Sequence, residues 1–108
     1  MLIDFNEMKE LCIENMNNGS GRVNSKMFMN ENGKVILCRI SQGASIGEHI
    51  QKSGNDINSV ISGVGKAICD GKEEQLYKGV CHYCPKNSVH SIINTGDEDL
   101  VLFTVVDG

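Results

Sequence analysis

The sequence predicts an all-β domain, a sandwich or barrel of short antiparallel strands. From residue 22 onward, short apolar runs alternate with turn residues, and many short strands at close, even spacing are typical of such folds. Twelve glycines provide the turns and bends that the fold needs. No linker or internal repeat divides the chain, so we expect one domain over residues 1–108, with its core barrel at about residues 22–106.

The turn residues divide the chain into expected strands. Their ranges are residues 22–29, 34–41, 44–51, 56–62, 64–70, 73–78, 80–84, 89–94 and 100–106. Asn32-Gly33 predicts a tight type I′ hairpin turn, in which both central residues have positive φ, and Asp70-Gly71 marks a second tight turn.

Residues 4–16 carry the only helical signal. Asp4 and Glu7 resemble a capping box, and apolar residues recur after them near helical spacing. Asn17-Asn18-Gly19 then ends the pattern. We expect a short N-terminal helical or irregular segment of one or two turns that lies across the barrel.

Charge and hydropathy exclude several classes of partner. Ten Lys and Arg face fourteen Asp and Glu, a net charge of −4, so the chain lacks the basic surface that nucleic acid requires. No stretch approaches the roughly 20 apolar residues of a membrane span. The first ten residues lack the basic-then-apolar order of a signal peptide. We therefore expect a cytoplasmic protein with no nucleic-acid or membrane partner.

Two segments carry polar residues and glycines at regular intervals. The first is Gly43, five residues, His49, one residue, Gln51, four residues, Asp56, six residues and Gly63. The second is Gly79, five residues, Pro85, one residue, Asn87, two residues, His90, three residues and Asn94. Together they resemble the two motifs of the cupin superfamily, Gly-x5-His-x-His-x3-4-Glu-x6-Gly and Gly-x5-Pro-x-Gly-x2-His-x3-Asn. The resemblance covers roughly residues 34–106 and implies the double-stranded β-helix, or jelly-roll barrel, of a small single-domain cupin of bacterial type.

Three positions depart from the family pattern. The second histidine is Gln51, the glutamate is Asp56, and the glycine of the second motif is Asn87. Asn tolerates left-handed backbone better than other non-glycine residues, so we expect Asn87 to keep the turn. The other two changes affect the chemistry of the site.

The spacing predicts that four side chains converge inside the barrel. His49 and Gln51 are two residues apart and share one face of a strand, while Asp56 begins the next strand. His90 opens a later strand, behind the only proline. The resemblance implies that Fe, Mn, Ni, Zn or Cu binds here, with His49, Gln51, Asp56 and His90 as ligands. The amide is a weak ligand, and Asp is shorter than Glu by roughly 1.5 Å. In the alternative, both histidines are hydrogen-bonded barrel filling.

Alternation along the strands extends the predicted pocket. Ser45 and Gly47 would share the face of His49, and Asn58 and Val60 that of Asp56. Ile92 and Asn94 would share the face of His90. We expect Ser45 and Asn58 to contact a small-molecule ligand.

Cys81-His82-Tyr83-Cys84 has the Cys-x-x-Cys spacing of zinc and redox sites. Zinc would need two further ligands, and a redox pair normally opens a helix. On a strand, Cys81 and Tyr83 should point one way and His82 and Cys84 the other. We interpret the segment as strand residues with free thiols.

Three functional hypotheses stay open. The first is a metal-dependent enzyme that acts on a small oxygen-rich molecule. The second is a non-catalytic small-molecule-binding cupin that has lost its metal, and a mainly structural dimer is a third. A homodimer is expected in any case, because small barrels expose strand edges and Met27 and Met29 flank Phe28 on an apolar strand.

Overall fold

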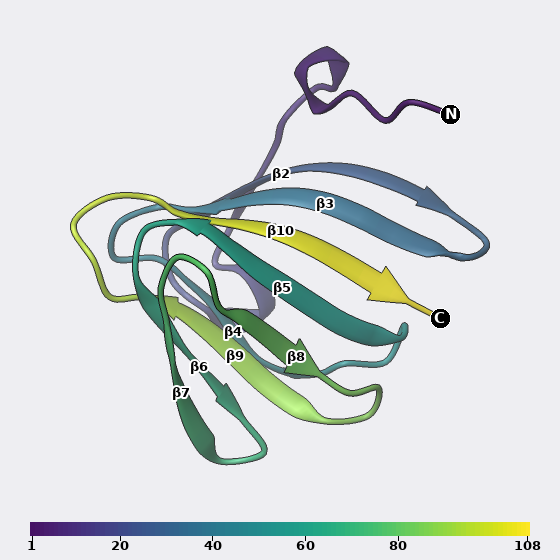
Figure 1. The fold of residues 1–108 in the computed structure, drawn as a ribbon. Helices are drawn as coiled ribbons and strands as arrows, with labels where there is room; N and C mark the ends of the chain where they lie inside the picture. The colour runs from purple at the N-terminus through teal and green to yellow at the C-terminus, as the bar shows by residue number, and fades with distance from the viewer.

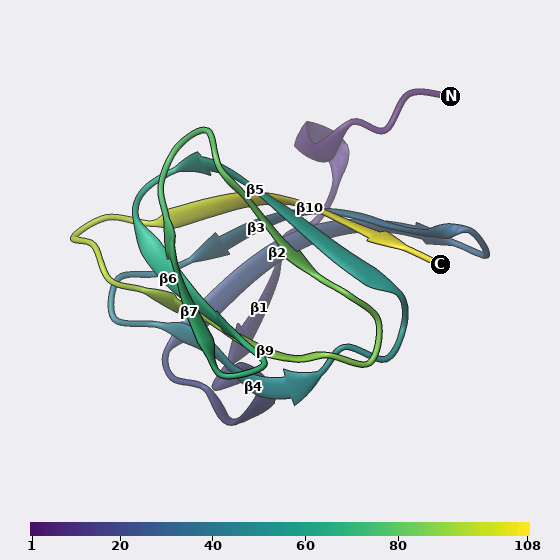
Figure 2. The same ribbon diagram turned by 60° about the horizontal axis from the view of Figure 1, so that its bottom comes forward.

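Ten strands form two antiparallel sheets that lie face to face (Figures 1 and 2). The computed structural model describes all of residues 1–108. The strands are β1 (Leu11–Glu14), β2 (Arg22–Asn30), β3 (Gly33–Ile40), β4 (Ser45–Ile50), β5 (Asn55–Ser62), β6 (Gly65–Cys69), β7 (Lys72–Leu76), β8 (Cys81–Cys84), β9 (Val89–Asn94) and β10 (Leu100–Asp107). One sheet has the order β1-β2-β3-β10-β5-β8 and the other β4-β9-β6-β7. This architecture confirms the predicted double-stranded β-helix.

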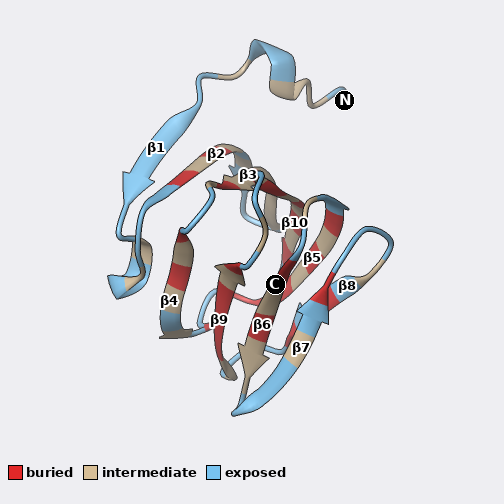
Figure 3. Cartoon of the chain, turned by 90° about the vertical axis from the view of Figure 1, so that its left-hand side faces the viewer, coloured by how far each residue is buried: buried red, intermediate tan, exposed pale blue.

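The nine strands predicted from residue 22 onward are all present, with ends that differ by one or two residues. Inward and outward residues alternate along them, as Figure 3 shows by the red bands on β4, β9, β6, β10 and β5. On β10, for example, the inward residues Leu100, Leu102, Thr104 and Val106 are buried. Burial of this inner face against the opposite sheet holds the two layers together.

The N-terminal segment contains less helix than the sequence predicts. Asp4 does act as a cap, since its Oδ1 accepts a hydrogen bond from the Asn6 backbone N–H at 2.9 Å, but the turn that follows, η1, covers only Phe5–Glu7. The second half of the predicted helix is β1, which pairs with residues Arg22–Ser25 of β2. Pairing with an available sheet edge outweighs the weak helical pattern. A second short turn, η2 (Met16–Asn18), follows β1.

Both predicted tight turns form, but the turn type at the first was wrong. Asn30 pairs with Gly33, so Glu31 and Asn32 are the central residues, and neither has positive φ. The Asn30 side chain closes this turn by accepting a hydrogen bond from the Asn32 backbone N–H at 2.9 Å. At Asp70-Gly71 both central residues have positive φ, 50° and 82°, as a type I′ turn requires.

The apolar core occupies one end of the space between the sheets. Its largest fully buried side chains include Ile40, Ile92, Leu100 and Leu102. Neither of the two short turns is long or apolar enough to cross a membrane. The polar inward residues of β4, β5, β8 and β9 lie beyond this core, and they form the site described next.

Candidate functional site

His49 faces the interior because β4 contains a β-bulge. Ile46 pairs with Ile92 of β9, and His49 pairs with His90, so two residues of β4 lie opposite one residue of β9 between them. Gly47 sits in the bulge, where an added Cβ would overlap the backbone carbonyl oxygen of Asn17 in η2. The bulge therefore depends on a close approach between β4 and the N-terminal segment.

The bulge removes Ser45 from the predicted pocket face. Strict alternation placed Ser45 with His49, but the extra residue shifts the pattern, and Ile46 faces inward instead. The Ser45 Oγ lies 3.2 Å from the Ser20 Oγ and accepts a hydrogen bond from the Ser20 backbone N–H at 3.1 Å. Ser45 is not among the residues that line the central cavity.

Asp56 and Asn58 point inward from β5, as predicted, and both are buried. Asn58 Nδ2 donates to Asp56 Oδ2 at 3.2 Å, and its Oδ1 accepts from Thr104 Oγ1 at 2.7 Å. Burial raises the pKa of Asp56, although the hydrogen bond from Asn58 acts in the opposite direction. The carboxylate thus stands in a polar patch that water reaches poorly.

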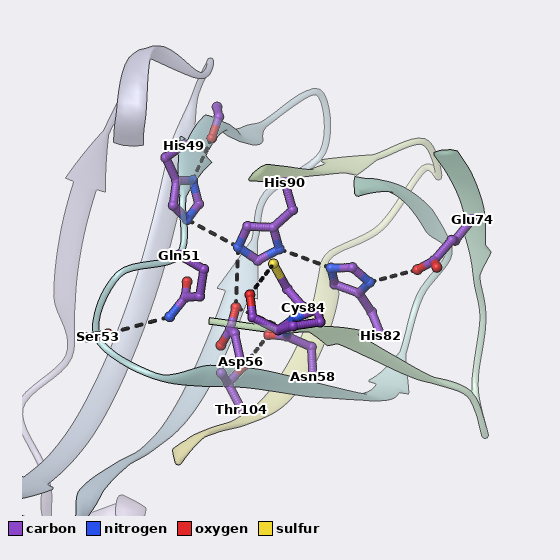
Figure 4. A network of polar contacts seen from close by, with 12 residues as sticks. His49, Gln51, Ser53, Asp56, Asn58, Glu74, His82, Cys84, His90 and Thr104 are labelled. Atoms are coloured by element: carbon purple, nitrogen blue, oxygen red, sulfur yellow. Dashed lines mark hydrogen bonds and ion pairs between the residues drawn. The ribbon is translucent and has the colours of Figure 1, made fainter. Parts of the chain in front are cut away.

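His90 lies at the centre of the polar network (Figure 4). Its Nε2 is 3.2 Å from His49 Nε2 and 3.5 Å from Asp56 Oδ2. The ring is almost fully buried, with an exposed fraction of 1%. The structure therefore brings His49, Asp56 and His90 together, as the motif spacing predicts.

Sequence reasoning missed two residues of this network, His82 and Glu74. His82 Nε2 lies 3.0 Å from His90 Nδ1, and His82 Nδ1 lies 2.7 Å from Glu74 Oε1. Alternation correctly placed His82 and Cys84 on one face of β8, but it did not show that this face points inward or which side chain of the other sheet His82 contacts. Glu74, on β7, had no sequence signal of its own.

With the three imidazoles neutral, their hydrogen-bond partners determine which ring nitrogen carries the proton. The Gly47 carbonyl oxygen can only accept, so His49 Nδ1, at 2.8 Å from it, carries a proton. The ionised Glu74 carboxylate also accepts, which places a proton on His82 Nδ1 and leaves Nε2 bare. His90 Nδ1 must then donate to His82 Nε2.

These assignments leave bare ring nitrogens facing each other. In the neutral rings, His49 Nε2 and His90 Nε2 both present lone pairs across 3.2 Å, beside the carboxylate of Asp56. Lone pairs at this distance repel unless a proton or a metal ion lies between them. Donors of this chemistry suit a first-row transition metal. No group of three His, Cys, Asp or Glu side chains lies close enough around one point to hold a metal ion in this arrangement, so a third ligand would need Gln51 or a side-chain adjustment of Asp56.

Gln51 joins the site from the loop after β4. Its side chain is buried, and Nε2 donates to Ser53 Oγ at 3.4 Å, while Oε1 makes no hydrogen bond within the protein. The Gln51 backbone oxygen accepts from the Asn87 N–H at 2.6 Å, which ties the two motif loops together. Asn87 has a φ of 76°, as expected of a residue in the glycine position of the motif.

These groups line one side of a cavity of about 190 Å³ between the two sheets. Half of its 18 lining residues are hydrophobic, and Ile13 of β1 and Met16 of η2 are among them. Lys34 is the only Lys or Arg in the lining, and Asp56 is the only Asp or Glu. The cavity thus has nearly balanced charge and suits a small, partly polar molecule.

The cysteines near the site are thiols. His82 and Cys84 face inward while Cys81 and Tyr83 are exposed, as alternation predicts. Burial raises the pKa of Cys84 to about 12, and the nearby Cys69 adds to the shift. All five cysteines are free. A thiol of such high pKa is a poor metal ligand at neutral pH, because the thiolate is the ligating form.

The burial of His90 makes stability depend on pH. Desolvation lowers the pKa of His90 to about 4, and the imidazoles of His49 and His82 act in the same direction. In the unfolded chain the pKa of histidine is about 6.5. Between these values the unfolded chain binds a proton that the folded protein does not, so stability falls as the pH falls from about 6.5 towards 4. The raised pKa of Asp56 offsets part of this loss at the acidic end, because the folded protein then takes up that proton first.

We expect metal-stripped protein to be less stable at pH 5 than at pH 7, with a contribution from His90 of at most about 2 kcal/mol. Urea unfolding at both pH values measures the difference. The His90→Gln variant removes the titrating ring and should show a smaller pH dependence. Equal pH dependence in parent and variant would contradict the assignment to His90.

Comparisons with known proteins agree with this architecture. A family model described as the cupin domain matches residues 36–106. An oxalate-binding protein of Thermotoga maritima is 27% identical over 112 residues, which cover 98% of this chain and 93% of that protein.

Solved structures show the same fold. The structure of a predicted oxalate decarboxylase from Thermotoga maritima has a TM-score of 0.91 at 24% identity and covers 99% of this chain and 98% of its own. A cupin-like protein from Thermotoga maritima has a TM-score of 0.74 at 28% identity, over 82% of this chain and 71% of its own. The motif spacing, the jelly-roll topology and the family match over residues 36–106 agree. They show that the chain belongs to the cupin family.

Proposed function

We propose that this cupin binds a small oxygen-rich anion, with oxalate as the first candidate, through a divalent transition metal. His49, His90 and Asp56 would hold the metal, with Gln51 as a weak fourth ligand or a contact to the anion. The observation that carries the proposal is the pair of bare Nε2 atoms that face each other at 3.2 Å beside a carboxylate. A cation between the two nitrogens would satisfy both lone pairs, and its charge would attract the neighbouring carboxylate.

The charge of the cavity supports a metal-dependent mode of binding. Lys34 and Asp56 are the only Lys, Arg, Asp or Glu residues in the lining, and they cancel. A dianion would gain little from such a surface and would lose its hydration on entry. A bound divalent cation would supply the missing positive charge and coordination positions that two carboxylates can share.

The chain's own residues would orient the anion. Asn58 Oδ1 accepts from Thr104 and one N–H of its Nδ2 donates to Asp56, so the second N–H could donate to the anion. Gln51 Oε1, which makes no hydrogen bond within the protein, can only accept and would face the cation. The apolar part of the lining limits water around the polar patch. A relative over nearly the full length is named an oxalate-binding protein, which is why oxalate is the first anion to test.

We expect untagged protein to contain bound transition metal, and oxalate to bind the metal-loaded protein far more tightly than the stripped protein. Elemental analysis gives the metal content, and calorimetric titration with Mn²⁺, Ni²⁺ or Zn²⁺ and then with oxalate gives both affinities. Acetate, which has a single carboxylate, should bind weakly.

Matched variants locate the site. His49→Ala and Asp56→Asn should each weaken metal binding by more than about tenfold, since even the loss of a group behind a ligand costs about 10–100-fold. Ser45→Ala should bind like the parent, because Ser45 contacts Ser20 outside the cavity. Equal oxalate affinity with and without metal would instead favour the metal-free binding protein. Absence of metal uptake would refute the metal part of the proposal.

Restoring the family's second histidine should strengthen metal binding. Gln51→His replaces a neutral amide by an imidazole, which divalent first-row metals prefer. We expect a gain of about tenfold, or ~1.4 kcal/mol, in calorimetric titration of the stripped variant. Binding should weaken as the pH falls below ~6.5, where free imidazole is protonated. Asp56→Ala in the same background should undo much of the gain, and no gain in Gln51→His would show that position 51 does not reach the metal.

We also propose that the protein is a homodimer formed at the outer edge of β2. β1 pairs only with Arg22–Ser25, so the remainder of β2 has no neighbour on that side. Met27 and Met29 lie on this stretch with exposed fractions of 41% and 63%. An open edge with apolar side chains is a common pairing surface.

Light scattering at micromolar concentration should give the mass of a dimer for the parent and of a monomer for Met29→Glu. Ile61→Glu changes an equally apolar, half-exposed residue on β5 and should leave the mass unchanged. A monomeric parent would contradict the proposal.

A further inference from the structure

A line of hydrogen bonds connects Glu74, a partly exposed carboxylate on the inward face of β7, to the side of His90 that faces away from the cavity. Glu74 Oε1 contacts His82 Nδ1 at 2.7 Å, and His82 Nε2 contacts His90 Nδ1 at 3.0 Å (Figure 4). The His82 side chain has an exposed fraction of 0%, and that of Glu74 has one of 38%. Neither residue lines the cavity, and neither occupies a specified position of the two motifs. The proposed function therefore leaves both residues without a role.

We propose that Glu74 and His82 are positioning residues that keep the proton of neutral His90 on Nδ1, so that its Nε2 lone pair stays available to a metal. The inference rests on the proposed metal site. It concerns which of two neutral forms His90 adopts, and it adds no ligand.

The cavity alone would favour the opposite form. His90 Nε2 faces two acceptors, the bare Nε2 of His49 at 3.2 Å and the carboxylate Oδ2 of Asp56 at 3.5 Å. A proton on His90 Nε2 would satisfy both acceptors, and it would also block the lone pair that a metal needs. Something on the other side of the ring must hold the proton at Nδ1.

His82 is the group that can do so. Its Nε2 is the only hydrogen-bond partner of His90 Nδ1, and it accepts only while its own proton is on Nδ1. The Glu74 carboxylate holds that proton in place with a short, charge-assisted hydrogen bond. The charge on Glu74 thus fixes the proton positions on two successive rings. As a result, His90 Nε2, the ring nitrogen on the cavity side, carries no proton. Groups behind a metal-bound histidine commonly set its form in this way.

The first test is made on metal-free, ¹⁵N-labelled protein, in which long-range ¹H–¹⁵N spectra identify the bare nitrogen of each histidine. In the parent we expect bare Nε2 atoms on His90 and His82. His82→Leu removes the acceptor, so the proton of His90 should move to Nε2. His82→Gln places an amide oxygen near the position of the lost Nε2 and should restore the parent form.

The second test is metal affinity, measured by calorimetric titration with Ni²⁺. We expect His82→Leu to weaken binding by about 10–100-fold, and His82→Gln to recover most of the loss. Glu74→Ala should weaken binding by a smaller factor, because His82 then divides its proton between two nitrogens. Glu73→Ala is the matched control: it changes the adjacent carboxylate on β7, which pairs with Lys66 at 3.2 Å, and should change neither the spectrum nor the affinity.

The outcomes separate this inference from the proposed function. If the parent binds metal but the bare nitrogen of His90 and the affinity are the same in Glu74→Ala and His82→Leu, the positioning role is overturned and the metal site stands. If His82→Leu does not fold, Glu74→Ala and His82→Gln decide by the same two measurements, since Glu74 is partly exposed. If the proton of His90 moves as expected but the parent binds no metal, the proposed function fails. The conclusion that Glu74 and His82 set the proton position on His90 then still holds.

Discussion

The pairing of β4 with β9 sets His49 directly opposite His90, and the rest of the polar cavity is arranged around these two rings. Each ring donates its Nδ1 proton away from the other, one to a backbone carbonyl and one to His82. The facing nitrogens are therefore both acceptors in a poorly solvated space. Such an arrangement lowers the stability of the protein, because two acceptors face each other with no donor between them.

Much of this site follows from the sequence, because its parts are local. Two-residue spacing places Asp56 and Asn58 on one face, and the motif intervals place His49 and His90 on neighbouring strands. Ser45 was placed wrongly because the bulge depends on the contact between Gly47 and Asn17, which lie thirty residues apart. The helical part of the N-terminal segment is shorter than predicted for a similar reason, since only the folded sheet provides the edge on which β1 pairs.

The hydrogen bonds that join Glu74, His82 and His90 show a different limit of prediction from the sequence. Alternation gives the face on which His82 lies, but its contact with His90 joins strands of two different sheets. Neither spacing nor the family motifs describe such a contact, and Glu74 is one acidic residue among fourteen Asp and Glu. Contacts between side chains of two different sheets form only once the sheets are packed, which is why the motif spacing predicted that His49, Asp56 and His90 converge but did not predict the contacts of His82 with His90 and Glu74.

The sheet order also bears on how the protein matures. β10 lies between β3 and β5, although it is made after all the other strands. Until residues 100–107 leave the ribosome, β3 and β5 present unpaired inner edges. The hydrogen bond from Thr104 to Asn58 cannot form before then. Completion of the larger sheet thus follows the synthesis of all its other strands. Until then these open edges are natural targets for chaperones and for mispairing between chains on one polysome.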